Sequence, residues 1–193
     1  MASLTGKVIG LGTLALVVAA LGLLAFGPED DRRGPARAAS GDDAKADTHA
    51  KVKVSGREFN LELALDNDKR FKGLSGRTDI PADGGMLFVF PDYAVGVQDF
   101  VMRDCPVPID IIYLDGSGRI QAFHEMKVEP ARGPGEGQPG EINMTYEQRL
   151  KKYSSRFPSQ FAIELKGGTI PSLNLEAGQK VELDTAGLKK RAK

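Results

Sequence analysis

The chain has 193 residues with 26 basic and 26 acidic side chains, so its formal net charge is zero. A neutral chain has no general electrostatic reason to bind nucleic acid, whose affinity rests largely on phosphate neutralisation, and we expect no nucleic-acid partner. Cys105 is the single cysteine of the sequence, which excludes an intramolecular disulfide and the class of disulfide-rich secreted scaffolds.

An uncharged apolar run occupies residues 8–26, with the sequence VIGLGTLALVVAALGLLAF. As a helix rising about 1.5 Å per residue, it just spans a hydrocarbon core of about 30 Å. We predict that residues 1–27 are a membrane anchor or signal segment that contacts the membrane through residues 8–26. An uncleaved single-pass anchor is favoured, because the best small-residue cleavage site, at residues 36–38, comes only after a charged cluster. Export after signal cleavage is the alternative.

The flanks of this run give opposing signals for its orientation. Arg32, Arg33 and Arg37 follow the run while only Lys7 precedes it, so the positive-inside rule alone favours a cytoplasmic domain. The short start of the chain, however, is typical of a signal-anchor that exports the domain on its C-terminal side. We predict an extracytoplasmic domain. Residues 28–50 contain no aliphatic side chain larger than Ala and are predicted to be a disordered linker.

Residues 51–185 are predicted to form one domain, which begins with a period-two pattern. Phe59, Leu61 and Leu63 alternate with polar residues, which is typical of a half-buried strand. Asp66 then offers an N-cap for a short helix over residues 67–74. Residues 86–90 are apolar on both faces and predict an interior strand.

The rest of the domain contains further short strands separated by turns. A short helix is predicted at residues 145–153, and strands are predicted at residues 96–103, 109–114, 119–128, 161–165 and 180–183. About seven short strands with one or two short helices predict a mainly β domain, a single compact sandwich or flattened barrel. The basic residues 186–193 are predicted to be a solvated C-terminal tail.

Asp110 is the charged residue that this strand pattern makes most conspicuous. It shares a strand face with Ile112 and Leu114, and the opposite face is also apolar, so its carboxyl group is predicted to be buried. A buried carboxylate needs a cation, hydrogen-bond donors or a proton. A structural ion pair is the favoured interpretation, and a ligand-binding or acid–base carboxylate is the alternative. The expected partners are Arg70, Arg77 and Arg103.

The remaining reactive side chains give weaker signals. His124 shares the apolar face of its strand with Ala122 and Met126, which is typical of a satisfied core histidine. The charge of Asp104 next to Cys105 would raise rather than lower the pKa of the thiol. No Cys-x-x-Cys or His-x-x-x-His motif is present, so neither a metal site nor a cofactor is predicted.

Ordered motifs along the domain resemble the DUF192 family, a family of unknown function, over about residues 52–184. They are Arg70-Phe-Lys-Gly73-Leu74-x-x-Arg77, Gly85-Met86-Leu87-Phe88-Val-Phe90, Phe100-Val-Met102-Arg103 and Pro108-Ile109-Asp110-Ile111. The resemblance implies a compact, mainly β fold, often behind an export signal, and no established activity.

The chain departs from the pattern that this resemblance implies at several positions. Ser75 stands where Met is usual, Val101 where Trp is usual, and Asp104-Cys105 where Asn-Thr is usual. The stretch over residues 131–156 also looks longer than the family's usual connection. If the Trp and the Asn-Thr pair help to form a binding surface, that surface is altered in this chain.

Three functions are compatible with the sequence. The leading hypothesis is a non-enzymatic binding or accessory module of the cell envelope, which contacts an unknown small ligand or envelope protein. One alternative is an enzyme that acts on a small polar substrate with Asp110 and Arg77 at its site, and another is a purely structural envelope protein. No catalytic residue is assigned. The candidate binding residues are Arg70, Arg77, Met102, Arg103, Asp104, Asp110 and His124.

Overall fold

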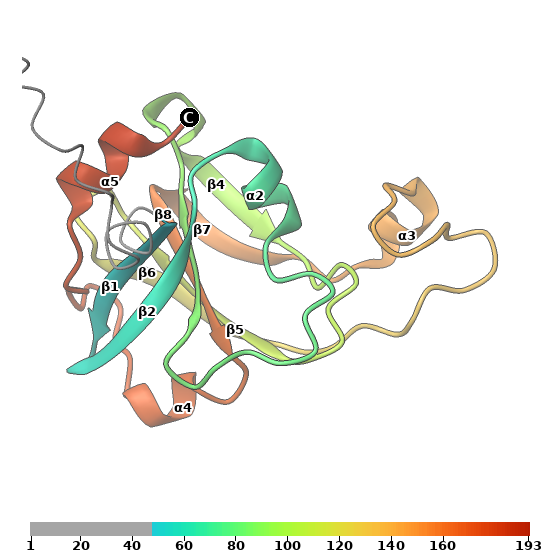
Figure 1. Cartoon of the computed structure of the whole chain (residues 1–193), viewed down its shortest axis with the longest axis horizontal. Helices are drawn as coiled ribbons and strands as arrows, with labels where there is room; N and C mark the ends of the chain where they lie inside the picture. Colours follow the sequence, from blue (N-terminus) through green and yellow to red (C-terminus); the bar gives the residue numbers. More distant parts are fainter. Residues whose placement is uncertain (1–47) are drawn as a thin grey trace, which may run out of the picture. The chain divides into compact units, whose positions relative to one another are not determined.

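A hairpin begins the part of the chain that the computed structural model describes, which is residues 48–193 (Figure 1). β1 (His49–Val54) and β2 (Arg57–Ala64) pair antiparallel. The two turn residues, Ser55 and Gly56, have φ angles of 49° and 81°, and positive φ at both positions is the conformation of a type I′ turn. Alternate residues of β2 are buried, which confirms the predicted half-buried strand.

The predicted membrane segment at residues 8–26, and the predicted linker as far as residue 47, lie outside the described residues. His49 and Ala50, which the linker prediction included, belong to β1 instead. Within residues 48–193, no helix is both long and apolar enough to cross a bilayer.

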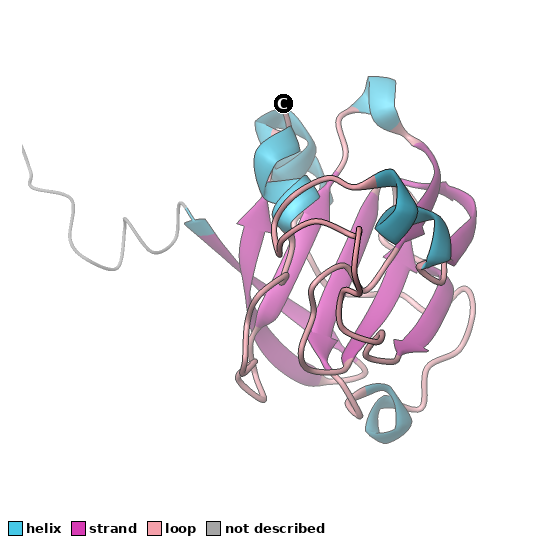
Figure 2. Ribbon diagram, turned by 90° about the vertical axis from the view of Figure 1, so that its right-hand side faces the viewer, coloured by secondary structure: helices cyan, strands magenta, loops and turns pink. Residues whose placement is uncertain are grey.

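Six strands form one mixed sheet in the order β1-β2-β3-β8-β5-β6. β3 runs parallel to β2, and the other neighbours pair antiparallel. A second sheet contains two antiparallel strands, β4 and β7. The described residues are therefore mainly β, with eight strands where about seven were predicted (Figure 2). The bounds are β3 (Gly85–Val89), β4 (Gly96–Phe100), β5 (Ile109–Leu114), β6 (Ile120–Met126), β7 (Tyr153–Ser159) and β8 (Phe161–Lys166).

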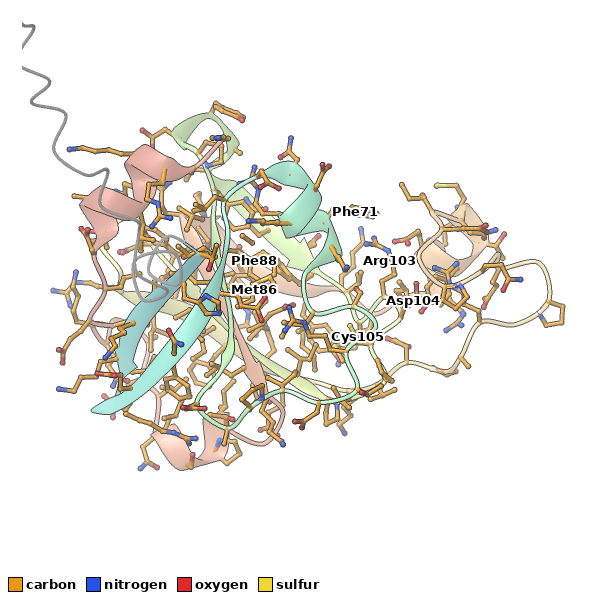
Figure 3. All side chains as sticks on the ribbon, in the orientation of Figure 1. Phe71, Met86, Phe88, Arg103, Asp104 and Cys105 are labelled. Atoms are coloured by element: carbon orange, nitrogen blue, oxygen red, sulfur yellow. The ribbon has the colours of Figure 1, made fainter. Side chains whose placement is uncertain are left out.

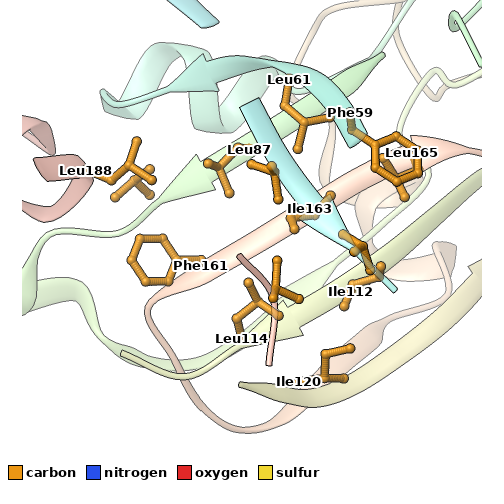
Figure 4. Close-up of a cluster of buried hydrophobic side chains, with 14 of the residues drawn as sticks. Phe59, Leu61, Leu87, Ile112, Leu114, Ile120, Phe161, Ile163, Leu165 and Leu188 are labelled. Atoms are coloured by element: carbon orange, nitrogen blue, oxygen red, sulfur yellow. The ribbon is translucent and has the colours of Figure 1, made fainter. Parts of the chain in front are cut away.

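The interior strands β3, β5 and β8 are buried on both faces, so their alternate residues enter two apolar clusters. We call one side of the sheet the α5 face, where Leu188 of the C-terminal helix packs with Leu87 and Ile163 (Figure 4). We call the other side the α2 face, where Leu74 follows the first helix and packs in the second cluster. Each fully buried Leu or Phe side chain contributes about 1.5–3 kcal/mol, so both clusters stabilise the sheet.

The first described helix, α2 (Asn67–Lys72), forms where the sequence predicted it. The side chain of Asp66 accepts a hydrogen bond of 2.9 Å from the N–H of Lys69, which satisfies one of the free donors at the helix start. Gly73 ends the helix with φ of 49°, a conformation that glycine adopts at little cost.

The other helices are short. α3 lies in the region where a helix was predicted, whereas α5 replaces the predicted solvated tail. Asp184 caps α5 through the N–H of Gly187, and Leu188 is buried. Because one apolar residue among basic neighbours gives no periodic pattern, the sequence did not reveal this packing. The bounds are η1 (Asp92–Ala94), α3 (Met144–Arg149), α4 (Ile170–Leu173) and α5 (Thr185–Arg191).

Two strand predictions were wrong. β7 was not expected, because Pro158 and three serines are residues that strands disfavour or place at edges. The strand predicted at residues 180–183 makes only isolated bridges, at Lys180 and Glu182. These bridges still tie the segment to Arg119 and Lys53, so it closes over the α5 face without joining the sheet as a strand.

Candidate functional site

A pocket of about 430 Å³ lies on the α2 face, lined by α2, the end of β4 and one residue of β8. Its apolar walls are the rings of Phe71, Phe88, Phe90 and Phe100. Phe88 and Phe100 meet edge to face with their ring centres 4.9 Å apart, which is a preferred aromatic geometry. A volume of this size is typical of small-molecule sites. Figure 3 labels Phe71, Phe88, Arg103 and Cys105, all of which line the pocket.

Glu164 of β8 is the buried polar residue of this pocket, with only 5% of its surface exposed. It stands opposite Met86 in β3 and Ile111 in β5, so its strand neighbours offer no polar side chain. Within residues 48–193, its Oε2 is the only buried side-chain oxygen or nitrogen without a hydrogen-bond partner.

Burial raises the pKa of Glu164 to about 8, against the opposing effects of the Leu74 N–H and the charge of Arg77. The carboxyl group is therefore mostly protonated at neutral pH and acts as both a donor and an acceptor of hydrogen bonds. An unsatisfied buried polar atom costs about 1–3 kcal/mol. Natural proteins keep few such groups, and each calls for a physical explanation.

Gly73 is the reason that this carboxyl group reaches the pocket. A Cβ atom at this position would lie 3.4 Å from Oε2 of Glu164 and 3.3 Å from the ring of Phe88. Any side chain here would therefore cover the carboxyl oxygen, and the positive φ of 49° would strain it as well. The glycine that ends α2 therefore also keeps the space next to the buried Glu164 carboxyl group free of a side chain.

Basic side chains surround the mouth of the pocket. Arg70 donates to the backbone carbonyl oxygens of Val89 and Lys193 at 2.9 and 2.5 Å. Arg103 forms a bidentate pair with Glu147 and stacks on the ring of Phe71, with its guanidinium carbon 4.5 Å from the ring centre. Both arginines, which the sequence proposed as binding residues, thus lie in one site.

Lys72 also lines the mouth, is exposed, and forms no ion pair among the described residues. Asp99 is the acidic residue of the mouth. If Arg103 and its partner Glu147 are counted together as neutral, Arg70 and Lys72 outweigh Asp99 by one charge. The mouth therefore favours anions.

The expected pairing of Asp110 with an arginine is wrong. Its carboxyl group accepts a hydrogen bond of 2.6 Å from the N–H of Ile170, and the nearby N–H groups of Gly168 and Thr169 also favour its charged form. Burial raises its pKa, and these backbone donors oppose that effect. Asp110 thus holds the turn that leads into α4. The sequence did not reveal this role, because backbone donors leave no residue pattern.

The expected partners of Asp110 bond elsewhere. Arg77 forms a bidentate pair with Glu62, with an Nη2–Oε2 distance of 2.6 Å, and this pair lowers the pKa of Glu62. Arg77 and Asp110 therefore do not form the joint site of the predicted enzyme.

His124 has the structural role that its strand pattern indicated. Its Nε2 lies 2.8 Å from the carbonyl oxygen of Ser154. The centre of its ring lies 6.1 Å from the ring centre of Tyr113 and 5.8 Å from that of Tyr153. Met102 is likewise a core residue with 1% exposure. Neither residue lines the pocket that contains Glu164.

Asp104 is engaged by the long loop after β6. Arg132 binds its two carboxyl oxygens at 2.8 Å each, and the N–H of Gly140 adds a third bond at 2.9 Å. Arg132 lowers the pKa of Asp104, and it also stacks 3.9 Å above the ring of Tyr146. The unusual Asp104 and the unusually long loop are therefore parts of one network.

The same loop contains a second ion pair. Arg149 binds both carboxyl oxygens of Glu136 at 2.6 and 2.8 Å, and this pair lowers the pKa of Glu136 to about 2. The pair of Arg132 with Asp104 fixes the loop against the domain, and the pair of Arg149 with Glu136 ties the loop to α3. A second pocket of about 660 Å³, which Asp104 and Arg132 help to line, lies next to them.

Cys105 lines both pockets, but its thiol is unreactive at neutral pH. Burial raises the pKa of its thiol to about 12, with a further contribution from Glu164. A thiol with this pKa is not a nucleophile at neutral pH. Within residues 48–193, no group of three or more His, Cys, Asp or Glu side chains is arranged to hold a metal ion.

The described residues thus define a mainly β domain with an aromatic pocket that contains a buried, unpaired carboxyl group. Residues 50–183 match the family model DUF192, described as "Uncharacterized ACR", and the chain belongs to this family. This confirms the family that the sequence motifs indicated.

Two solved structures resemble the chain. One is a protein from Sinorhizobium meliloti 1021 proposed to be a transcription regulator, with 26% identity and a TM-score of 0.55, over 71% of this chain and 95% of that chain. The other is a protein of unknown function from Novosphingobium aromaticivorans DSM 12444, with 23% identity and a TM-score of 0.50, over 69% and 83%. A search of curated proteins found no significant match.

Proposed function

We propose that this domain is a non-enzymatic binding module that takes a small ligand in the pocket on the α2 face. The observation that carries the proposal is the unpaired Oε2 of Glu164, buried in a pocket with four phenylalanine walls. A ligand that bonds to this oxygen removes the cost of an unsatisfied buried group and gains apolar contact with the rings. Small-molecule sites typically combine apolar walls with a few such polar groups.

Binding is favoured over the enzymatic alternative by the chemistry of the pocket. Its one thiol, Cys105, has a pKa of about 12, and the two residues proposed for an enzyme site bond elsewhere: Asp110 to backbone amides and Arg77 to Glu62. Nucleophilic catalysis needs a nucleophile beside a base that activates it. The lining residues offer no such pair.

The role in transcription proposed for the Sinorhizobium protein is not carried over to this chain. The identity of 26% supports a shared fold, while the equal numbers of 26 basic and 26 acidic residues give no general attraction for nucleic acid. The arrangement of the pocket supports a small ligand better.

We also propose that residues 8–26 hold the module at the cell envelope, with the domain outside the cytoplasm. The support is the charge-free apolar run and the polar linker after it. Protease added outside intact cells should degrade the domain, whereas full protection of the domain would contradict the proposed orientation.

A thermal-shift screen of the full chain in mild detergent tests the pocket. The panel contains carboxylic acids, amides, amines, sugars, nucleotides and short peptides. A ligand at a hundredfold its Kd adds about 2.7 kcal/mol to the free energy of unfolding, or very roughly 5–10 °C for a domain of this size.

Two variants assign a hit to the pocket. Glu164→Leu removes the carboxyl group among apolar neighbours, and Asp79→Asn is the control because Asp79 is exposed and paired with Lys166 outside the pocket. A shift that survives in Asp79→Asn and disappears in Glu164→Leu supports the proposal. No shift across the panel, or hits that Glu164→Leu leaves unchanged, would contradict it.

A further inference from the structure

The buried end of the pocket is suited to an uncharged group. The charged or titratable side chains that influence Glu164 or are influenced by it are Arg77, Cys105 and Tyr113. The charge of Arg77 is balanced by Glu62, and the pKa values of the thiol and the phenol are raised, so both stay neutral. A charged ligand group placed here would lose its hydration without a compensating partner.

The walls suit a flat or aliphatic body. Phe88 is fully buried and Phe100 is partly buried, and Phe71 stands at the outside with half of its surface exposed. The pocket thus becomes more exposed from Phe88 towards Phe71. A ligand with an apolar body of a few carbon atoms could therefore extend from the buried carboxyl group of Glu164 to the solvent.

The mouth suits a negative charge. Lys72 is exposed and unpaired among the described residues, and Glu147 engages the Nε and Nη2 atoms of Arg103 but not its Nη1. With Arg103 and Glu147 again counted together as neutral, Arg70 and Lys72 outweigh the acidic Asp99 by one positive charge. Guanidinium and ammonium groups at a partly dry site bind carboxylates and phosphates by charge-assisted hydrogen bonds.

Resting on the proposed function, we infer that the ligand is a small organic anion with a neutral polar group at its opposite end. Its carboxylate or phosphate lies at the mouth with Lys72 and Arg103, its apolar body lies between the phenylalanine rings, and its hydroxyl, amide or carbonyl group bonds to Oε2 of Glu164. An organic amine is the competing class. An amine would have to pass the positively charged mouth and accept the proton of the Glu164 carboxyl group.

The test uses two matched sets of probes that share a terminal hydroxyl group and differ in charge at the other end. One set is 4-hydroxybenzoate, 4-hydroxybenzamide and 4-hydroxybenzylamine, and the other is 6-hydroxyhexanoate, 6-hydroxyhexanamide and 6-aminohexan-1-ol. Each is titrated into the full chain in mild detergent, and the backbone amide resonances of Gly73 and Leu74 report binding next to Glu164. We expect each carboxylate to bind at least about tenfold more tightly than its amide, and each amine to bind most weakly.

Three variants test the assigned contacts. Lys72→Gln should narrow the preference for carboxylate over amide to within about threefold, whereas Lys69→Gln, a change on α2 outside the pocket lining, should leave the preference unchanged. Binding of 6-hydroxyhexanoate, whose hydroxyl group does not ionise in this range, to the wild type should weaken about tenfold between pH 6.5 and pH 9, because it requires protonated Glu164. Glu164→Gln should remove this pH dependence.

The outcomes separate the two proposals. If the amines bind as tightly as the carboxylates, or if Lys72→Gln has no effect, the anion class is overturned while the pocket keeps its binding function. If none of the six probes moves the Gly73 and Leu74 resonances, the anion class is also overturned. The thermal-shift panel then tests the binding function itself. Hits from another chemical class would support a binding function, whereas no hit across the panel would contradict it.

Discussion

Two buried carboxyl groups lie close together in the same sheet and have different roles. In the pairing of β5 with β8, Asp110 stands opposite Leu165 and Glu164 stands opposite Ile111. The two acids are therefore one residue step apart but on opposite faces, because neighbouring positions of a strand point to opposite sides. Asp110 is 1% exposed and Glu164 is 5% exposed, so burial alone does not distinguish them.

Their partners distinguish them. Asp110 meets the backbone N–H groups of the turn into α4, and its burial is explained by the structure that it holds. Glu164 faces the gap left by Gly73, and one of its oxygens has no partner. A buried acid with all its hydrogen bonds made is a structural group. A buried acid with an unused oxygen in a pocket is a candidate for binding.

The largest effect is expected from Asp110→Ala. The change removes the acceptor of the Ile170 N–H and the carboxylate next to the Gly168 N–H, whereas the Thr169 N–H keeps its bond to Lys166, and each unsatisfied buried donor costs about 1–3 kcal/mol. We expect the free energy of unfolding to fall by about 4 kcal/mol in total, measured by denaturant unfolding. A loss below about 1 kcal/mol would show that these bonds do not hold the turn.

The next effect is expected from Glu164→Gln and depends on pH. Because the pKa of Glu164 is raised from 4.5 to about 8 on folding, the wild type should lose stability as the pH rises from about 4.5 to about 8. By linkage this loss is about 3 kcal/mol between pH 5 and pH 8. Glu164→Gln should not show it, so the variant should be the more stable protein at pH 8. Parallel stability curves for the two proteins would contradict the assignment.

A smaller and local effect is expected from Asp104→Asn. Asp104 has φ of 51°, which Asn tolerates, so the backbone should keep its shape while the charge that Arg132 binds is lost. The N–H of Gly140, which bonds to Asp104, should then exchange its hydrogen faster. In the wild type, the protection of this N–H relative to its intrinsic exchange rate should fall in the same way as the pH falls through the lowered pKa of Asp104. Unchanged exchange at Gly140 would show that other contacts hold the loop.

The smallest effect is expected at the exposed pair of Lys166 and Asp79. Their nitrogen and oxygen lie 3.2 Å apart, with side-chain exposures of 50% and 77%. Exposed pairs contribute about 0–1 kcal/mol, so Asp79→Asn should change the melting temperature by less than about 4 °C. A larger change would disqualify this variant as the control for the pocket.

Much of the fold was predictable, because the elements that carry it follow simple patterns. The alternation in β2, the two-sided apolar run of β3, and the cap and stop of α2 at Asp66 and Gly73 were all readable from the sequence. β7 and α5 were not, since their packing depends on single residues such as Tyr153 and Leu188 and not on a periodic pattern.

The site was predictable only in part. Arg70 and Arg103 were proposed as partners of Asp110 and as binding residues; they do not pair with Asp110, but both line the pocket. Glu164 was missed as a site residue, although one signal was present: it is a charge inside the otherwise apolar stretch of β8. The same signal, a charge within an apolar strand, drew attention to Asp110 but was not applied to Glu164. It could not say which acid has its hydrogen bonds satisfied, because the partners are backbone groups brought together by the fold.

The protonation state of Glu164 is the most direct test of the difference between this unpaired acid and the hydrogen-bonded Asp110. A carboxyl ¹³C NMR titration of the full chain, with Glu164→Gln used to assign the resonance, should find that Glu164 titrates near pH 8. Saturating 6-hydroxyhexanoate should move that titration to still higher pH, because the anion binds the protonated form. Titration near pH 4.5 would contradict a neutral, unpaired carboxyl group at this position, and a curve that the probe leaves unchanged would contradict the binding of an organic anion there.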